Sequence, residues 1–217
     1  MRKVMIGTPC YDGKVELDYM KSLIETMKLC NEYGIDLQLQ FLIGNSLIQT
    51  ARNEIFSHAI EQQVDDLVFI YSDQDWKPEY FIQILSHDVD IIGGVVPGKN
   101  DQVSYNPKAL ESGFKIDENG LVEVKGVGTG FMRISKRALE LMWSKSAPYF
   151  YEHKQGRSVF EAKVIDGHMV GEDIGFCFKW RDLGEKVYID PAITCGHIGR
   201  KKWVGNFLDH LKIVGGL

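Results

Sequence analysis

The first hundred residues alternate between short apolar runs and segments with helical spacing, and this alternation constrains the fold more than any other feature. Strands are predicted at residues 3–9, 35–43, 66–72 and 90–97. Helices are predicted between them at residues 15–33, 46–62 and 78–87, with Ser46 as an N-cap and Pro78 in a first turn. This order indicates an α/β fold in which helices cover both faces of a mostly parallel central sheet.

The second half of the chain follows a different pattern. It predicts a hairpin at 113–126, a strand at 128–135, helices at 135–146 and 171–184, and a strand at 186–190. Ser135 is the expected cap of the first of these helices, and residues 97–112 are expected to form a crossover loop. No internal repeat or linker interrupts the chain, so residues 1–217 are predicted to be a single domain with halves at 1–100 and 101–217.

Composition limits the class of protein and its compartment. The 217 residues are 44% hydrophobic and carry a net charge of −5, which argues against a surface built for nonspecific nucleic-acid binding. The four cysteines form no CxxC pair and are expected to be buried free thiols. No apolar run reaches the roughly 18 residues that a membrane span needs, and the N-terminus lacks a signal-peptide core. A cytoplasmic location is expected, in the host cytoplasm if the protein is viral.

Two aspartates, Asp73 and Asp75, directly follow the third predicted strand in the stretch YSDQDW. Ligands of open α/β sheets bind at the carboxyl ends of the strands. Side chains at i and i+2 of an extended segment face the same way, so both carboxylates are expected to point into that crevice. Hard oxygen donors of this kind suit Mg²⁺ or Mn²⁺. A solvated acidic loop is the alternative.

Several further segments, in order between residues 3 and 203, resemble motifs of the GT-A nucleotide-sugar glycosyltransferases, and of family-2-like enzymes in particular. Besides the D-x-D stretch, they are SLIQTARNEIFSHAI, GVGTGFMRISKRALE, GEDIGFCFKWRDLGEKVYID and CGHIG. The resemblance implies a Rossmann-like GT-A fold with a smaller acceptor-side β/α lobe. It assigns residues 1–100 to nucleotide binding and residues 101–217 to the donor sugar and the acceptor.

The same resemblance implies a metal site. Asp75 would ligate Mn²⁺ or Mg²⁺, Asp73 would bind the ribose or share the metal, and His197 would be a third ligand. A divalent cation there would lower the barrier by neutralising charge on the leaving diphosphate. A structural or surface histidine is the alternative for His197.

Contacts to the donor, a nucleoside-diphosphate sugar expected to be UDP-linked, are predicted for a wider set of residues. Tyr11 is expected to stack on the base, the glycines to allow close backbone approach, and the RKKW segment at 200–203 to close over the diphosphate. Ordinary loop or surface roles are the alternatives. The set is Thr8, Pro9, Tyr11, Arg52, Asp73, Gly128, Gly130 and Lys202.

Glu172 and Asp173 fall in the first turn of the predicted helix at 171–184. The positive end of a helix favours ionised carboxylates, and an ionised carboxylate beside a hydroxyl group serves as a general base. By resemblance, Asp173 is the base and Glu172 orients the sugar or the acceptor, which implies an inverting displacement; a retaining enzyme stays open. Acids that merely stabilise the helix are the alternative.

The acceptor is the least determined part of the prediction. Compact enzymes of this kind resemble viral and phage glycosyltransferases, some of which modify hydroxymethylated pyrimidines in DNA. A modified DNA base is therefore one predicted acceptor, and a glycan is the other. The clustered acids also fit a metal-dependent nuclease or phosphatase, and a non-catalytic nucleotide-sugar-binding module is a third possibility.

Overall fold

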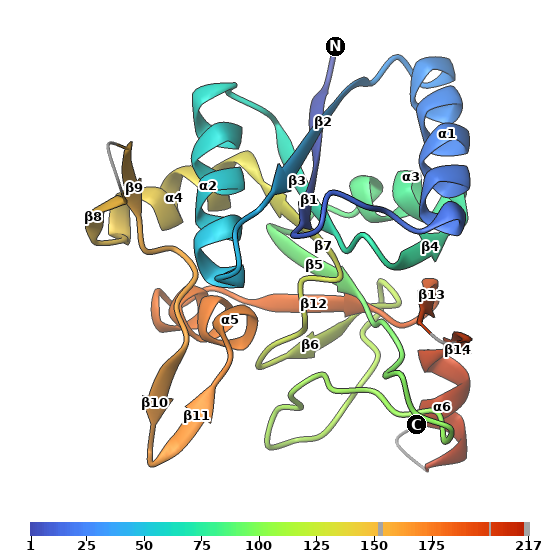
Figure 1. The fold of residues 1–217 in the computed structure, drawn as a ribbon. Coiled ribbons are helices and arrows are strands. Elements are labelled where there is room, and N and C mark those ends of the chain that lie inside the picture. The colour runs from blue at the N-terminus through green and yellow to red at the C-terminus, as the bar shows by residue number, and fades with distance from the viewer. Residues whose placement is uncertain (152–153, 200, 215–217) are drawn as a thin grey trace.

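The computed structural model describes residues 1–151, 154–199 and 201–214, and a seven-stranded sheet forms its centre (Figure 1). The strand order is β2-β1-β3-β7-β5-β12-β6. All of these strands run in one direction except β7 and β6, which are antiparallel to their neighbours. The strands are β1 (Lys3–Cys10), β2 (Asp36–Ile43), β3 (Asp66–Ile70), β5 (Ile91–Gly94), β6 (Val122–Val124), β7 (Phe131–Ser135) and β12 (Val187–Asp190). The predicted mostly parallel α/β sheet is confirmed.

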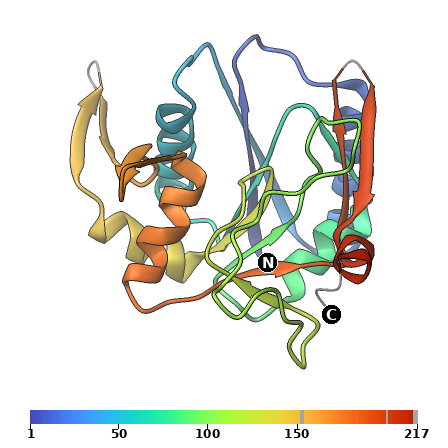
Figure 2. The ribbon, with the colours of Figure 1, turned by 90° about the horizontal axis from the view of Figure 1, so that it is seen from below.

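Helices cover both faces of this sheet, as Figures 1 and 2 show. One hydrophobic cluster contains side chains of α1 and α3, and the other contains side chains of α2, α4 and α5. The helices are α1 (Leu17–Glu32), α2 (Ile48–Glu61), α3 (Pro78–Ser86), α4 (Lys136–Lys145), α5 (Glu172–Asp182) and α6 (Phe207–Ile213). Because β7 lies between β3 and β5, the second half of the chain contributes a strand to the middle of the sheet that the first half builds.

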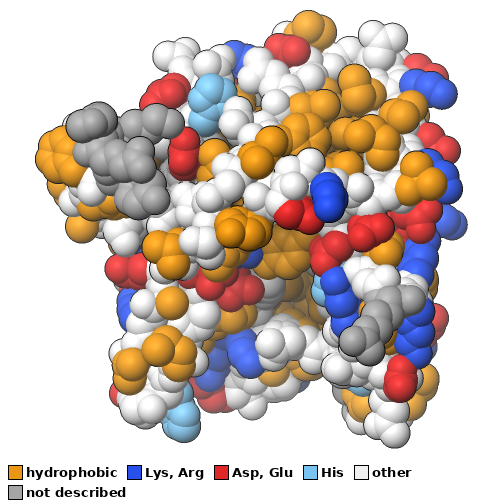
Figure 3. Space-filling model, in the orientation of Figure 1, with side chains coloured by type: hydrophobic (Ala, Val, Ile, Leu, Met, Phe, Trp, Pro, Cys, Tyr) orange, Lys and Arg blue, Asp and Glu red, His pale blue; other side chains and the backbone are white. Residues whose placement is uncertain are grey.

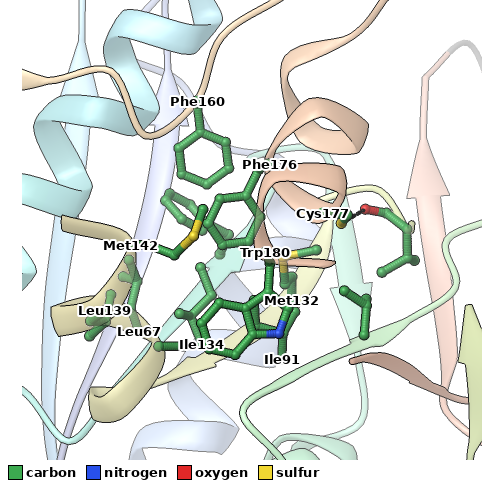
Figure 4. Close-up of a cluster of buried hydrophobic side chains, with 14 of the residues drawn as sticks. Leu67, Ile91, Met132, Ile134, Leu139, Met142, Phe160, Phe176, Cys177 and Trp180 are labelled. Atoms are coloured by element: carbon green, nitrogen blue, oxygen red, sulfur yellow. Dashed lines mark hydrogen bonds between the residues drawn. The ribbon is translucent and has the colours of Figure 1, made fainter. Parts of the chain in front are cut away.

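Strand β3 is buried along its whole length, as its continuous apolar sequence predicts. Successive side chains point to opposite faces, so Phe69 belongs to the cluster under α2, α4 and α5, whereas Val68 belongs to the cluster under α1 and α3. Figure 4 shows the cluster under α2, α4 and α5, where the rings of Phe160 and Phe176 stack with centroids 4.5 Å apart. This packing anchors α5, whose first turn carries the predicted catalytic acids.

The two predicted helix caps have different outcomes. Ser135 is confirmed as the N-cap of α4, because its hydroxyl accepts a hydrogen bond from the amide of Ala138 at 3.2 Å. Ser46 is wrong as the cap of α2, which begins at Ile48 after Leu47. The side chain of Asn45 instead accepts from the amide of Leu47 at 3.1 Å, so an asparagine turn precedes this helix.

Several short strands outside the central sheet were not predicted. A three-stranded sheet joins β4, β13 and β14, and two hairpins lie between α4 and α5. These strands are β4 (Gln74–Trp76), β13 (Thr194–Ile198), β14 (Lys202–Asn206), β8 (Pro148–Tyr151), β9 (Lys154–Arg157), β10 (Lys163–Ile165) and β11 (His168–Val170). The predicted hairpin at 113–126 forms only in part: Ile116 bridges to Val122 around a turn with Gly120 at φ +79°, and β6 is its regular strand.

The cysteines fit the sequence-based expectation. All four cysteines are free and buried, as predicted. Within the described ranges, no helix combines the length and the apolar character that crossing a membrane requires.

Candidate active site

A cavity of about 260 Å³ lies at the carboxyl ends of β3 and β5. Figure 3 shows this face of the molecule hollowed near its centre, with acidic and basic side chains along the hollow. Tyr71 follows β3, Val95 to Pro97 follow β5, and the segment that leads into β7 adds two glycines. The lining is Tyr71, Val95, Val96, Pro97, Asn106, Pro107, Val127, Gly128, Gly130, Asp173, Ile174 and His197. The cavity therefore brings together four predicted site residues: Gly128, Gly130, Asp173 and His197.

Asp73 lies in the turn between β3 and β4, where two basic groups face one of its carboxylate oxygens. The Lys99 ammonium is 2.5 Å and the His197 Nε2 atom is 3.4 Å from Oδ2. Burial acts to raise the pKa of Asp73, but hydrogen bonds and charge from His197 and Lys99 outweigh it, so the pKa is lowered. Asp73 is thus held in its ionised form.

Asp75 lies on β4 opposite Gly196 of β13. Its Oδ2 atom pairs with the Lys202 ammonium, whereas its Oδ1 atom is buried and has no hydrogen-bond partner among the described residues. A Cβ atom at position 196 would collide with Oδ1. Gly196 is therefore required for the Asp75 carboxylate to lie where it does.

His197 is oriented by the backbone. Its Nδ1 atom lies 2.8 Å from the carbonyl oxygen of Pro97, and a carbonyl only accepts, so Nδ1 carries a proton. The Nε2 atom then faces Asp73. A lone pair facing a carboxylate is unfavourable unless a proton or a cation lies between them.

The Asp73 and Asp75 carboxylates fit Mn²⁺ or Mg²⁺, whereas the His197 imidazole suits Mn²⁺, and the Asp75 Oδ1 atom is a buried oxygen without a partner among the described residues. Their present arrangement does not close around an ion: across the ranges that the structure describes, no three His, Cys, Asp or Glu side chains converge on a point suited to a metal. The lysine ammonium groups hold the positive charge at this position instead.

Glu172, in the first turn of α5, forms an ion pair with Arg52 of α2. The Arg52 side chain is 2% exposed, and its Nη2 atom donates to the Tyr71 hydroxyl at 2.6 Å. That hydroxyl also shares a hydrogen bond with Thr129 at 3.1 Å. Arg52 does not line the cavity and is engaged with Glu172 and Tyr71, and its predicted contact with the nucleotide stays a prediction.

Asp173 faces the cavity beside Gly128. Its Oδ1 atom accepts from the amide of Ile174 at 2.7 Å, and a Cβ atom at position 128 would lie 3.4 Å from Oδ2. Within the described part of the chain, Asp173 forms no ion pair with a lysine or an arginine. One carboxylate oxygen therefore remains available to a ligand in the cavity.

The predicted base-binding residues at the end of β1 do not line this cavity. The Thr8 side chain is fully buried, and its hydroxyl lies 2.7 Å from the Tyr19 hydroxyl, so it is engaged within the core. Tyr11 is 65% exposed, and Pro9 is half-buried. A nucleobase contact at these three residues stays a prediction.

The two cavity glycines differ in what surrounds them. A Cβ atom at Gly130 would collide with the Gln74 amide group, whose nitrogen and oxygen are buried without a hydrogen-bond partner among the described residues. At Gly128 the nearest group is the Asp173 carboxylate. Close packing therefore requires glycine at 130, whereas glycine at 128 leaves space beside Asp173.

Sequence reasoning missed Lys99 and Tyr71 as site residues. Tyr71 belongs to the YSDQDW stretch, so its position next to the D-x-D aspartates was a usable signal. Lys99 belongs to the predicted crossover loop, and its contact with Asp73 spans 26 residues. Arg200, part of the predicted flap, lies outside the described residues.

A larger cavity, of about 370 Å³, lies between α2 and the β8–β9 hairpin. Its lining consists of Gln40, Thr50, Asn53, Glu54, Ser57, His58, Glu61, Tyr149, Gln155 and Gly156. None of the predicted site residues is among them, and the cavity does not lie at the carboxyl ends of the central strands. Chemistry rather than size therefore identifies the smaller cavity as the candidate site.

No protein-family model matches this sequence, and no curated protein matches it. Among solved structures, the chain is similar to the A197 protein from STIV, with 18% identity, a TM-score of 0.58 and 95% of each chain covered. It is similar to Drosophila beta1,4-galactosyltransferase 7, a mutant in complex with manganese, UDP-Gal and xylobiose, with 12% identity, a TM-score of 0.51, and 88% of this chain and 65% of that chain covered. It is also similar to GalNAc-T7 with UDP, GalNAc and Mn²⁺, with 10% identity, a TM-score of 0.56, and 98% of this chain and 48% of that chain covered. These likenesses show a GT-A glycosyltransferase fold.

Proposed function

We propose that this chain is a glycosyltransferase that moves a sugar from a nucleoside-diphosphate sugar to a hydroxyl group of an acceptor. The observation that carries the proposal is the cavity at the carboxyl ends of the strands, where Asp173 faces Gly128 and His197 lies beside Asp73. Two proteins that share the fold were crystallised with UDP or a UDP-sugar and manganese, which supports a UDP-linked donor.

The proposed chemistry is a single displacement with Asp173 as the general base. Asp173 removes the proton from the acceptor hydroxyl, whose oxygen forms a bond to the anomeric carbon. The bond from that carbon to the diphosphate oxygen breaks, and its electron pair leaves with the diphosphate. Attack from the opposite side inverts the anomeric centre. Glu172, held by Arg52, positions the first turn of α5 and therefore Asp173.

Asp75, Asp73 and His197 are proposed to hold the divalent cation. When bound, Mn²⁺ or Mg²⁺ would stabilise the negative charge that develops on the leaving diphosphate. Gly128 and Gly130 are proposed to admit the donor sugar, and Pro9 and Tyr11 to border the nucleobase. Thr8 would act through the position of its strand, because its hydroxyl is engaged with Tyr19.

The acceptor is proposed to be a glycan or a hydroxymethylated DNA base. Binding to modified DNA that weakens steeply with added salt would support the DNA base as the acceptor. Lysine and arginine side chains that neutralise DNA phosphates release counter-ions, so added salt opposes such binding. An absence of DNA binding at low salt would leave the glycan. The four buried free thiols fit a reducing compartment, and we propose a cytoplasmic location on that basis.

The test is to incubate the protein with Mn²⁺ and a panel of nucleotide sugars, with and without acceptors, and to measure free nucleoside diphosphate. Release that depends on one donor and on the metal supports the proposal, and mass spectrometry of the acceptor identifies the transfer. Phosphate release or DNA cleavage without a sugar donor would indicate a nuclease or phosphatase. A thermal shift with nucleotide but no turnover would indicate a binding module. No diphosphate release and no thermal shift with any nucleotide would overturn the proposal.

A further inference from the structure

Both carboxylates of the D-x-D stretch have a lysine partner, and the two lysines come from segments far apart in the sequence. Lys99, in the loop after β5, pairs with Asp73 at 2.5 Å, and Lys202, at the start of β14, pairs with Asp75. The predicted site contains Lys202 as a diphosphate contact, but nothing in the prediction pairs it with an aspartate.

These pairs occupy one oxygen of each D-x-D carboxylate, the Oδ2 atom. Lys99 and the His197 Nε2 atom face the same oxygen, Oδ2 of Asp73. Lys202 holds Oδ2 of Asp75, while Oδ1 of Asp75 is packed against Gly196. A cation that binds Oδ2 of Asp73 and Oδ2 of Asp75 must therefore displace both ammonium groups.

Both ion pairs are exposed enough for another cation to displace the lysines. The side chains of Lys99 and Lys202 are 35% and 38% exposed, and ion pairs at such exposure contribute little to stability because solvent screens them. Lys202 has a second acidic neighbour, Asp18, whose Oδ2 atom lies 4.0 Å from its ammonium. The displaced lysine thus has another partner within reach.

The two lysine-bearing segments are linked to each other. The carbonyl of Pro97, near the start of the Lys99 loop, accepts from His197 of β13, and Asp101 of the same loop pairs with Lys201 in the β13–β14 turn. A displacement of one segment therefore affects the other. Both segments lie beside the cavity that would receive the donor diphosphate.

We propose that Lys99 and Lys202 are internal counter-ions, which compete with the divalent cation for the D-x-D carboxylates and bind the donor diphosphate once the cation displaces them. The inference rests on the proposed function and adds two opposite roles for the same lysines. They weaken binding of the cation alone, and they strengthen binding of the nucleotide to the cation-loaded protein.

The test uses Mn²⁺ alone and then UDP at saturating Mn²⁺, each measured by isothermal titration calorimetry, with electron paramagnetic resonance to count free Mn²⁺. Lys99→Met and Lys202→Met each remove one competing ammonium group and keep the alkyl stem. Each is expected to tighten Mn²⁺ binding by about two- to fivefold, the value of an exposed ion pair, and the double variant by about tenfold. UDP binding is expected to weaken by about tenfold per lysine, because a charge-assisted hydrogen bond is lost.

The matched control is Lys186→Met, which makes the same change of charge but removes a lysine that pairs with Glu123 just before β12, at the end of the strands opposite the cavity. It is expected to change neither constant by more than about twofold, because exposed pairs away from the site are weak. An equal effect of Lys186→Met on Mn²⁺ affinity would reduce the result to net charge and overturn the inference.

The remaining outcomes separate the inference from the proposed function. Lysine variants that weaken UDP binding without tightening Mn²⁺ binding would overturn the competition and leave the glycosyltransferase standing. UDP binding by the unmodified protein without any Mn²⁺ binding would overturn the inference and the proposed metal site, and would leave glycosyl transfer without a metal. Binding of neither Mn²⁺ nor any nucleotide sugar would overturn both.

Discussion

The candidate site contains two pairs of acidic residues whose counter-ions differ in burial. Asp73 and Asp75 pair with lysines that are 35% and 38% exposed, whereas Glu172 pairs with an arginine that is 2% exposed. An exposed pair exchanges readily with other ions, but a buried charge that loses its partner is strongly destabilising. The difference separates a part of the site that can change ligands from a part that must keep its geometry.

The second carboxylate of each pair extends this contrast. Within the described residues, Asp173 has no basic partner, although it adjoins Glu172, whose charge Arg52 neutralises. The Arg52 side chain also bonds Tyr71, which lines the same cavity. A fixed frame thus surrounds one free carboxylate, as a general base requires. Asp73 and Asp75 are paired instead with two partly exposed lysines.

The largest expected effect tests the free carboxylate. Asp173→Asn keeps the shape of the side chain but removes its basicity, so we expect transfer to fall by about 10² to 10⁴-fold while nucleotide binding is retained. Steady-state transfer rates and UDP titrations measure the two quantities. Asp182→Asn, an exposed aspartate at the other end of the same helix, is the control and should transfer normally. Near-normal transfer by Asp173→Asn would require another base.

The next effect compares the free energy of unfolding after loss of the buried Arg52 and after loss of the exposed Lys99. Arg52→Met leaves Glu172 unpaired and is expected to lower the free energy of unfolding by about 3–5 kcal/mol, whereas Lys99→Met, at an exposed pair, should change it by less than about 1 kcal/mol. Urea unfolding monitored by tryptophan fluorescence provides both values. Adding Glu172→Gln to Arg52→Met should restore part of the loss, because the unpaired charge of the partly buried Glu172 is then removed. Equal losses for the two single variants would contradict the contrast.

The sequence was sufficient to predict the positions of the acids but not their partners. Asp73 and Asp75 follow a fully buried strand, and Glu172 and Asp173 open a helix, so local pattern places all four at ligand-binding ends. The partners of these acids depend on contacts between distant segments, such as Arg52 with Glu172, which no local pattern encodes. Arg52 was accordingly predicted to face the nucleotide.

The missed β elements have a similar explanation, with one exception. Strands of three residues, such as β4, are too short to show alternation and exist because β13 pairs with them. The β10–β11 hairpin carried a signal that was overlooked. Asp166 and Gly167 both have positive φ, at 49° and 77°, and Asp-Gly is a preferred pair for a two-residue hairpin turn.

A smaller effect tests how tightly the Asp75 carboxylate, which pairs with Lys202, is packed against Gly196. Gly196→Ala places a methyl group against the Asp75 carboxylate and is expected to lower the free energy of unfolding by about 1–3 kcal/mol, as overpacking does. Urea unfolding measures the loss. The new Cβ atom would also lie 2.7 Å from Cε of Lys202, but that atom is near the end of a flexible side chain and can move. Asp75→Ala combined with Gly196→Ala removes the colliding carboxylate and should therefore recover most of the loss. A double variant as unstable as the sum of the single variants would show that the collision is not the cause.

The smallest expected effect is the loss of stability when an exposed ion-pair cluster far from the candidate site is broken. Arg137, with a side chain 54% exposed, pairs with both Asp90 and Glu185. Burial acts to raise the pKa of Asp90, but hydrogen bonds from Arg137 and Ser135 outweigh it, so the pKa is lowered. A carboxylate with a lowered pKa stabilises the fold above its unfolded pKa of about 3.9, and this contribution disappears as the pH falls through the folded pKa. Asp90→Asn should therefore lower the free energy of unfolding at pH 7 by about 0.2–1 kcal/mol, with the difference shrinking as the pH is lowered below about 4. Urea unfolding at a series of pH values measures it, and a difference that grows toward low pH would show that Asp90 is not stabilised in its charged form.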